Sequence, residues 1–227
     1  CLQETKVVDE DFPREPFEAL GYECAISGQK SYNGVAILSR LPMKGVRMGF
    51  DEGEPADETR LIWGKVGPMI IVNTYVPQGR DIESEHYRYK LEWLARLREF
   101  FERNFTPRRR VLWVGDINVA PEPRDVHDPK GLRDHPDFHI DAREAMAAVV
   151  EWGFVDLFRM HSDEDGQFSY YDYRAPNALA RGVGWRVDHL FATRSLANKC
   201  VSARIDLGPR AMERPSDHTP VIAEFDL

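Results

Sequence analysis

Long apolar runs are missing from this sequence of 227 residues, since no stretch approaches the roughly 20 residues that a membrane-spanning helix needs. Cysteine is scarce: Cys1, Cys24 and Cys200 are scattered and odd in number, which indicates reduced thiols of a cytosolic protein rather than a disulfide framework or a zinc site. No signal-peptide pattern, internal repeat or Gly/Ser-rich linker is apparent. We therefore expect one domain over residues 1–227, with a substantial core.

An excess of positive charge is also missing, because the formal net charge is -8 at pH 7. Taken alone, that balance argues against a partner held by bulk electrostatics, such as nucleic acid or an anionic membrane. It does not exclude DNA, since clustered carboxylates can hold a divalent cation that faces a phosphate. Local arginines are candidates for a basic rim: Arg108, Arg109, Arg110, Arg181, Arg186, Arg210 and Arg214.

Short runs rich in Val, Ile and aromatic residues predict strands between Gly and Pro breaks. They cover residues 22–27, 34–39, 61–66, 69–76, 110–115, 187–193 and 220–225. Apolar residues at 3–4 spacing predict a helix over 83–105, and a second helix over 142–152 would have Asp141 as N-cap, Glu144 in a capping box and Gly153 at its end. Grouped strands with inserted helices favour an α/β sandwich in which two sheets pack face to face with helices outside.

Polar residues gather where the predicted strands end. VLWVGDIN places Asp116 and Asn118 two apart, so on an extended backbone they would point the same way while Ile117 faces the core. Together they could orient a water molecule and accept its proton. Asp and Asn are also ordinary turn residues, and this is the simpler explanation for the motif alone.

Three further strand ends carry polar groups. MIIVNTYVPQG places Asn73 and Tyr75 on one face, where the tyrosine could donate a hydrogen bond to a phosphate or pack as a half-buried ring. Asp188 lies in an apolar strand and needs a partner, because an unpaired buried acid is costly. His218, in RPSDHTPV, is a natural partner whose tautomer Asp188 would fix, and the adjacent Asp217 could join a metal cluster.

As a set, these groups point to a hard cation. Glu4, Asp116, Asn118 and Asp217 are oxygen donors, and oxygen-rich sites suit Mg²⁺ or Mn²⁺. The sequence has neither a Ser or Cys nucleophile motif nor a Gly-rich phosphate loop with Lys. A hard cation, a positioned water and a phosphate-facing histidine predict hydrolysis of a phosphate ester.

The ordered motifs LQETK, GVAILS, NTYVPQG, GDINVAPEPRDVHDP, FSYYDYR, GWRVDH and SDHTPV span essentially the whole chain. In this order they resemble the exonuclease III family of AP endonucleases, within the exonuclease–endonuclease–phosphatase superfamily. The resemblance implies a DNase I-like, four-layer α/β sandwich of two packed mixed sheets flanked by helices. It also implies Mg²⁺-dependent cleavage of double-stranded DNA 5′ to abasic sites, with 3′-to-5′ exonuclease and 3′-phosphatase activities. A bacterial, nucleoid-associated, monomeric enzyme of the cytoplasm is expected, with no membrane partner.

The resemblance also implies roles for single residues. The metal ligands would be Glu4, Asp116, Asn118, Asp217 and His218. The catalytic set would be Tyr75, Asp116, Asn118, Asp188 and His218, with Asp116 acting on the attacking water and Tyr75 on the phosphate or leaving oxygen. Substrate contacts would come from Asn73, Gln78 and Arg80, and from Phe168 and Trp185, which would wall a pocket for a flipped-out abasic sugar. Ordinary core packing is the alternative for the two aromatic residues.

One departure from the family pattern concerns the start of the chain. Members have a strand and helix of roughly thirty residues before LQETK, and that strand ends in an Asn that helps to hold the metal. The present sequence opens directly on CLQETK, so we expect an N-terminally truncated domain with one ligand fewer and an exposed sheet edge.

Two alternatives to this function stay open. One is another phosphodiesterase or phosphatase of the superfamily, acting on inositol phosphates, sphingolipids or non-abasic DNA, because GDxN and SDH are common to all of these. The other is a non-catalytic nucleic-acid-binding relative, similar to the catabolite repression control proteins of some bacteria. Such relatives lose active-site residues, whereas all those named above are present here.

Overall fold

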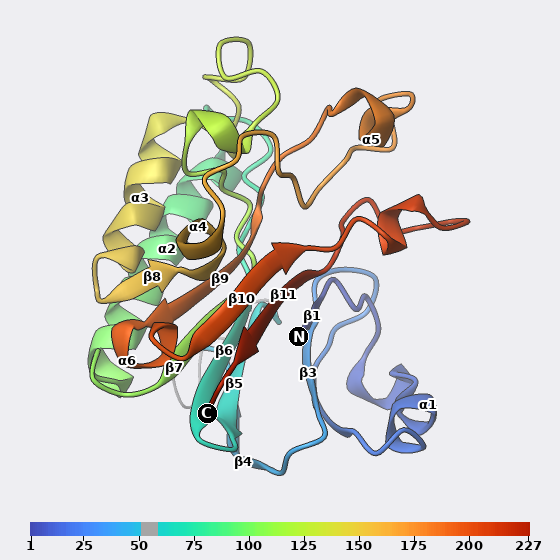
Figure 1. Cartoon of the computed structure of the whole chain (residues 1–227), viewed down its shortest axis with the longest axis vertical. Helices are drawn as coiled ribbons and strands as arrows, with labels where there is room; N and C mark the ends of the chain where they lie inside the picture. The colour runs from blue at the N-terminus through green and yellow to red at the C-terminus, as the bar shows by residue number, and fades with distance from the viewer. Residues whose placement is uncertain (51–58) are drawn as a thin grey trace.

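The computed structural model describes residues 1–50 and 59–227, and a six-stranded mixed sheet crosses its centre (Figure 1). Its strands, in spatial order, are β4 (Met43–Met48), β5 (Leu61–Val66), β6 (Met69–Tyr75), β7 (Val111–Asp116), β9 (Asp188–Thr193) and β8 (Phe154–Asp156). Strands β6 and β7 are parallel, because the long helix α2 (Glu85–Asn104) connects them, and every other neighbouring pair is antiparallel.

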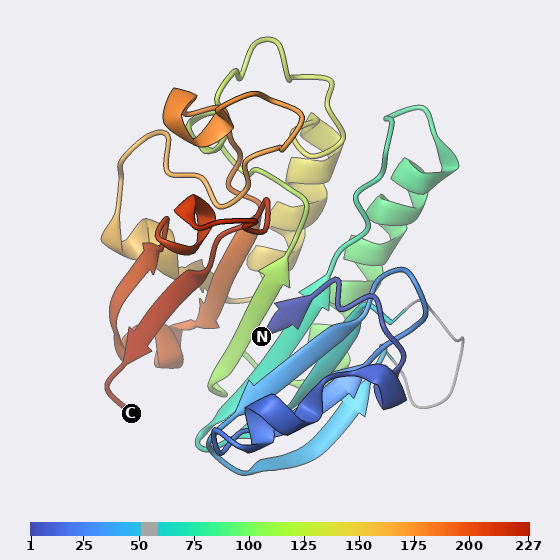
Figure 2. The same ribbon diagram turned by 90° about the vertical axis from the view of Figure 1, so that its right-hand side faces the viewer.

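Two smaller sheets lie side by side against one face of this sheet (Figure 2). One contains β1 (Leu2–Gln3), β3 (Val35–Ser39) and β2 (Glu23–Ser27), and the other contains β10 (Cys200–Ile205) and β11 (Val221–Phe225). The predicted face-to-face packing is confirmed, but this layer is not a mixed sheet, since the strand pairs in both of its pieces are antiparallel.

Helices complete the four layers of the predicted α/β sandwich. Helices α2 and α3 (Ile140–Val150) cover the outer face of the six-stranded sheet (Figure 1). On the opposite side, Phe12 and Phe17 beside and within α1 (Arg14–Glu18) pack on Ile26 of β2. The remaining short helices are α4 (Leu157–His161), α5 (Ala178–Arg181) and α6 (Arg194–Ala197). Within the described residues, no helix combines the length and the apolar character needed to cross a bilayer.

The larger core lies between α2, α3 and the six-stranded sheet and is strongly aromatic. Phe101 of α2 contacts Trp113 of β7, Trp152 and Phe154, with ring centroids 5.8, 5.4 and 4.8 Å away. The predicted helix face is confirmed, because Tyr87, Leu94, Leu97 and Phe101 are buried along α2 and Leu91 is partly buried. Apolar burial of this extent is what holds the helix on the sheet.

Element boundaries mostly agree with the sequence, with two kinds of error. The second helix begins at Ile140, and its N-cap is His139 rather than Asp141, because the imidazole accepts the Asp141 backbone N–H. Strands β4, β8 and β10 were not predicted. β4 is largely exposed, with Lys44, Gly45 and Arg47 interrupting its apolar residues, and β8 has three residues, so neither shows the expected apolar run.

Phe101→Ala is expected to lower the free energy of unfolding by about 3–5 kcal/mol, because it leaves a cavity among packed rings. Leu20→Ala is the matched control, since the Leu20 side chain is 63% exposed and its loss is expected to cost less than about 0.5 kcal/mol. Urea unfolding followed by circular dichroism measures both. Equal shifts of the two midpoints would contradict the assignment of Phe101 to the core.

Candidate active site

Three polar side chains stand in one row across the central sheet. Tyr75 is the last residue of β6, Asp116 is the last of β7 and Asp188 is the first of β9. The register pairs Tyr75 with Asp116 and Asp116 with Asp188. Residues separated by 41 and 72 positions in sequence (116 − 75 and 188 − 116) therefore become direct neighbours at one edge of the sheet.

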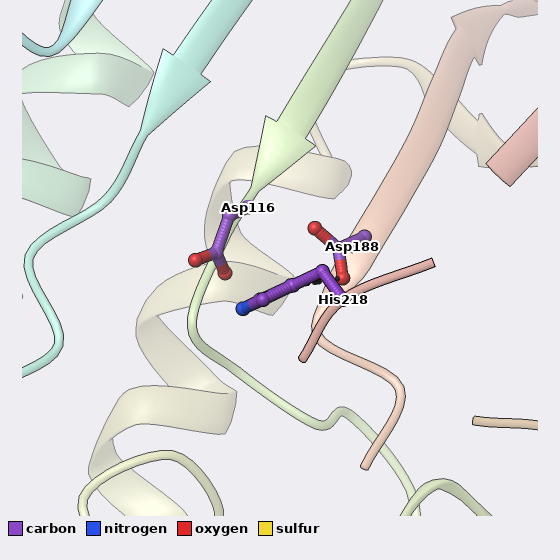
Figure 3. A group of neighbouring side chains, drawn as sticks. All are labelled: Asp116, Asp188 and His218. Atoms are coloured by element: carbon purple, nitrogen blue, oxygen red, sulfur yellow. Dashed lines mark hydrogen bonds and ion pairs between the residues drawn. The ribbon is translucent and has the colours of Figure 1, made fainter. Parts of the chain in front are cut away.

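His218 joins the row from the segment that precedes β11. Its Nδ1 lies 2.8 Å from Oδ2 of Asp188, which confirms the predicted pairing. One ligand atom from each of Asp116, Asp188 and His218 lies within 4.8 Å of the others. Figure 3 shows the nitrogen at the far end of the imidazole pointing toward Asp116. With Nδ1 engaged by Asp188, Nε2 is the ring nitrogen available to a ligand.

The electrostatics of this cluster favour a charged imidazole. Burial acts to lower the pKa of His218, but the charge and hydrogen bond of Asp188, with the charges of Asp116 and Asp217, raise it to about 10. Burial raises the pKa of Asp116 above its ordinary value, although the charge of His218 and the Asn118 N–H oppose this. The site thus pairs a hydrogen-bond donor, His218, with a carboxylate that holds protons more readily than usual.

Glu4 and Lys6 form the side of the site next to Tyr75. Glu4 accepts a hydrogen bond from Tyr75 and pairs with Lys6 at 2.5 Å, and both Glu4 and Lys6 have left-handed backbones, with φ of 54° and 57°. Burial and the charges of Asp116 and Glu4 raise the pKa of Tyr75, so its hydroxyl stays protonated. The charge of Asp217 acts to raise the pKa of both Lys6 and His218.

The predicted metal ligands are therefore only partly brought together. Asp116 and His218 belong to the close cluster, which also contains Asp188, while Glu4, paired with Lys6, and Asp217 lie outside it. The Lys6 ammonium supplies positive charge beside Glu4. Carboxylates outnumber nitrogens here, and this donor chemistry fits a hard divalent cation better than zinc.

Asn118 reaches the site by a different geometry from the one expected. Its φ of 52° is left-handed, so Asp116 and Asn118 do not share a face of an extended strand. Direct hydrogen bonds orient the side chain instead: Asn118 donates its backbone N–H to Asp116 Oδ1 (2.9 Å) and its amide to Asp116 Oδ2 (3.2 Å) and the Val76 carbonyl (2.9 Å). Ile117 faces the core as predicted.

Asn73 faces the same side of β6 as Tyr75, but it is not placed to touch a substrate. The residue is fully buried. Its amide donates to the carbonyls of Leu2 and Ala36, both at 2.9 Å, and accepts from Gln3 at 2.6 Å. Asn73 therefore ties β1 and β3 to the central sheet, which corrects the expectation of a substrate contact.

The two predicted pocket aromatics are largely covered. Phe168 is 3% exposed and packs with Tyr171 and Ala178, and Trp185 is 8% exposed. The ring of His135 lies 4.5 Å from that of Trp185, so the histidine covers part of the expected wall. Both aromatic residues take part in core packing, and the partly exposed group beside Trp185 is His135.

Gln78 and Arg80, the other predicted substrate contacts, lie on the loop after β6. Gln78 donates its amide to Asp137 Oδ2 at 3.3 Å and accepts the Arg80 backbone N–H at 2.8 Å. Arg80 is exposed and has a left-handed backbone, with φ of 58°. The loop thus holds Gln78 partly against the protein and presents Arg80 to solvent.

A buried ion network beneath the site was missed by the sequence analysis. Arg186 binds Asp125 through two hydrogen bonds of 2.7 and 3.1 Å and Asp156 through one of 2.7 Å. It is 1% exposed, so it cannot belong to the basic rim that was expected to include it. Its position between the apolar residues Trp185 and Val187 was the available signal.

His189 extends this network toward the site. Arg186 can only donate, so the 3.0 Å contact makes His189 Nδ1 an acceptor, and Nε2 donates to the Val119 carbonyl at 2.8 Å. Burial and the charge of Arg186 lower the pKa of His189 to about 4, which keeps the ring neutral. The backbone of Val119, which follows Asn118, is thereby hydrogen-bonded to the side chain of His189, which follows Asp188.

Comparison with known proteins identifies the family of the chain. The model of the Endonuclease/Exonuclease/phosphatase family matches residues 1–218. The chain belongs to this family. An exodeoxyribonuclease III of Haemophilus influenzae is 34% identical, over 99% of this chain and 88% of that protein, and an exodeoxyribonuclease of Bacillus subtilis is 32% identical, over 97% and 85%. The protein is thus a hydrolytic nuclease related to exonuclease III.

Solved structures agree with this family assignment. An AP endonuclease from Archaeoglobus fulgidus is 47% identical with a TM-score of 0.96, covering 99% of this chain and 87% of that one. A 3′ phosphatase from Neisseria, bound to a product DNA hairpin, is 34% identical with a TM-score of 0.95, covering 100% and 88%. These family structures share the α/β sandwich described above.

The pairing of Asp188 with His218 makes a direct prediction for titration. In the metal-free protein, His218 is expected to keep its proton until about pH 10, and Asp188→Asn should move the titration back toward about 6.5. The pair's contribution to stability is then complete below about pH 6.5 and lost as the pH rises toward 10. Imidazole NMR signals measure this, with Asp141→Asn, beside His139, as control. Titration of His218 below pH 7 in the unaltered protein would contradict it.

Proposed function

We propose that this protein is a Mg²⁺-dependent DNA repair phosphodiesterase that cuts duplex DNA 5′ to abasic sites and leaves a 3′-hydroxyl. The observation that carries the proposal is the row of Tyr75, Asp116 and Asp188, completed by His218. This set offers a carboxylate to act on water, a charged donor for a phosphoryl oxygen and a hydroxyl donor. The names of the relatives, exodeoxyribonuclease III and AP endonuclease, support DNA as the substrate.

The metal would be Mg²⁺, with Mn²⁺ as a possible replacement. We propose that Asp116, Glu4, Asp217 and the Asn118 amide oxygen hold it, with His218 Nε2 close by. A bound divalent cation supplies Lewis acidity toward a phosphoryl oxygen and a bound water. The surplus of carboxylates supports this choice.

Each chain residue then has a role in the hydrolysis. Asp116 orients the attacking water and takes its proton, and Asn118 fixes the carboxylate through its two hydrogen bonds. His218, held by Asp188, donates to a non-bridging phosphoryl oxygen as negative charge develops there. Tyr75 keeps its hydroxyl proton and can donate to the phosphate or leaving oxygen. The bond between the water oxygen and phosphorus forms and the bond from phosphorus to the 3′ oxygen breaks, and that oxygen takes a proton from solvent water and leaves as a hydroxyl.

Substrate contacts are proposed on the loops around this row. Arg80 would meet the DNA backbone, and its exposure beside Gln78 supports this role. Phe168 and Trp185 would back the pocket for the abasic sugar, behind His135. Monomeric state and a location in the bacterial cytoplasm, near the nucleoid, stay predictions.

The test uses a 5′-labelled duplex with one abasic-site analogue. We expect one cut 5′ to the lesion in Mg²⁺, none with EDTA, and a rate about 10²–10⁴-fold lower for Asp116→Asn, because the group that acts on the water is lost. Release of phosphate from a soluble inositol phosphate, without cleavage of DNA, would favour the sister phosphatases instead. Tight DNA or RNA binding with no metal-dependent cleavage would favour a non-catalytic relative.

A second activity, removal of phosphates and nucleotides at 3′ ends, is favoured by the covering of Trp185. An extruded sugar needs room beside the aromatic wall, whereas a terminal phosphate does not, and His135 occupies part of that room. His135→Ala is expected to raise cleavage at abasic sites about tenfold relative to 3′-phosphate release, as one unfavourable contact of about 1.4 kcal/mol would imply. His161→Ala, exposed at the end of α4, is the control. An unchanged ratio for His135→Ala would show that this histidine does not restrict the pocket.

A further inference from the structure

The apolar face of α2 carries one charged side chain that the packing of the helix does not require. Lys90 has no exposed surface, although it lies among Tyr87, Trp93 and Leu94 on the buried side of the helix. A buried lysine is costly unless it is paired and fully hydrogen-bonded, and an apolar side chain at this position would pack at lower cost. The charge therefore calls for an explanation beyond stability.

The Lys90 ammonium meets four acceptors that come from three separate loops. Nζ lies 2.6 Å from the Asn118 carbonyl, 3.1 Å from that of Gln78 and 3.0 Å from that of Pro136. It also lies 2.8 Å from Asp137 Oδ1. An ammonium has three donors, so every one is used and one is shared. A single side chain thus joins the loop after β6, the loop after β7 and the loop before α3.

These three loops position two parts of the site, one containing Asp116 and Asn118 and the other containing His135 beside Trp185. Asn118 is the left-handed residue whose N–H groups orient Asp116, and its own carbonyl receives the shortest of the Lys90 bonds. On the other side, Asp137 follows His135 and Pro136, so the anchored loop carries the histidine that covers Trp185. Lys90 itself touches neither the close cluster nor the surface.

Neighbouring contacts leave the ammonium little freedom. The Asp137 carbonyl accepts the Ala120 N–H at 2.7 Å, which links the two loops a second time. Gly79 has a φ of +93°, and a Cβ there would lie 3.1 Å from both the Lys90 stem and the Tyr87 ring. The loop after β6 therefore lies directly on the lysine stem, and a shift of the stem would shift all three loops.

We infer that Lys90 is a positioning residue, which fixes Asp116 and Asn118 relative to the His135–Asp137 loop and so sets both metal binding and the rate of hydrolysis. The inference rests on the proposed roles of Asp116 and Asn118 at the metal. Lys90 makes no contact with substrate. Its role comes from its charge and its three carbonyl contacts, not from the packing of its stem.

The experiment separates geometry from the penalty of an unpaired charge. Lys90→Met keeps the length of the stem but leaves the Asp137 carboxylate without its ion pair, so some of its effect is loss of stability. The double variant Lys90→Met/Asp137→Asn removes both charges and is expected to regain most of the lost melting temperature. Arg88→Met is the matched control: Arg88 lies on the same helix, pairs with Glu85 and has a side chain 65% exposed.

Two readouts are taken on folded protein, below the melting temperature of every variant. Mn²⁺ binding, followed by electron paramagnetic resonance, is expected to weaken at least fivefold in the double variant. The kcat for DNA cleavage at saturating Mg²⁺ is expected to fall at least tenfold, with KM changed less than threefold, while Arg88→Met matches the unaltered protein in both. Lys90→Arg, which keeps the charge, should recover part of the kcat.

Unchanged Mn²⁺ affinity and unchanged kcat in the folded double variant would overturn the inference and leave Lys90 a structural residue only. If the unaltered protein itself neither binds Mn²⁺ nor cleaves DNA, the proposed function fails, and the two failures are thereby distinguished.

Discussion

The register of three neighbouring strands, β6, β7 and β9, is the constraint on which the site depends. Backbone hydrogen bonds alone set Tyr75, Asp116 and Asp188 side by side. Because side chains alternate along a strand, a slip of one residue would turn Asp116 away from its neighbours and turn Ile117 out of the core. Gly115 protects this register: a Cβ there would lie 1.9 Å from the Thr74 carbonyl oxygen, so only glycine lets β6 and β7 meet at this point.

Buried charges surround this row, while apolar packing supplies the stability. On one side, Arg186 gathers Asp125 and Asp156 and connects through His189 to the Val119 backbone. On the other, Lys90 gathers carbonyls from three loops. Such ions gain little net free energy after desolvation, but each accepts only a narrow set of geometries. Apolar burial in the aromatic core between α2 and β7 offsets the free-energy cost of desolvating these ions.

The sequence predicted most of the strands and the meeting of Asp116, Asp188 and His218, because both depend on local patterns. Apolar runs ended by polar residues located Asp116, Asp188 and His218, and the ordered motifs resembled one family. It could not predict that the Asn118 backbone is left-handed. Nor could it predict that the Asn73 amide is hydrogen-bonded to Leu2, Gln3 and Ala36, since those partners are distant in sequence. The burial of Lys90 and Arg186 was missed for the same reason, because a charged residue in an apolar pattern does not show which groups will accept its hydrogen bonds.

The site draws on residues from Glu4 to His218, and this spread has a consequence for synthesis on the ribosome. The chain emerges from its N-terminus, so Tyr75 and Asp116 are translated well before Asp188, and His218 comes later still. Until the SDH segment has left the ribosome, the partly folded chain has carboxylates but no imidazole beside them. With the roles proposed for these residues, nucleolytic competence therefore cannot arise before His218 has been translated and has reached Asp188.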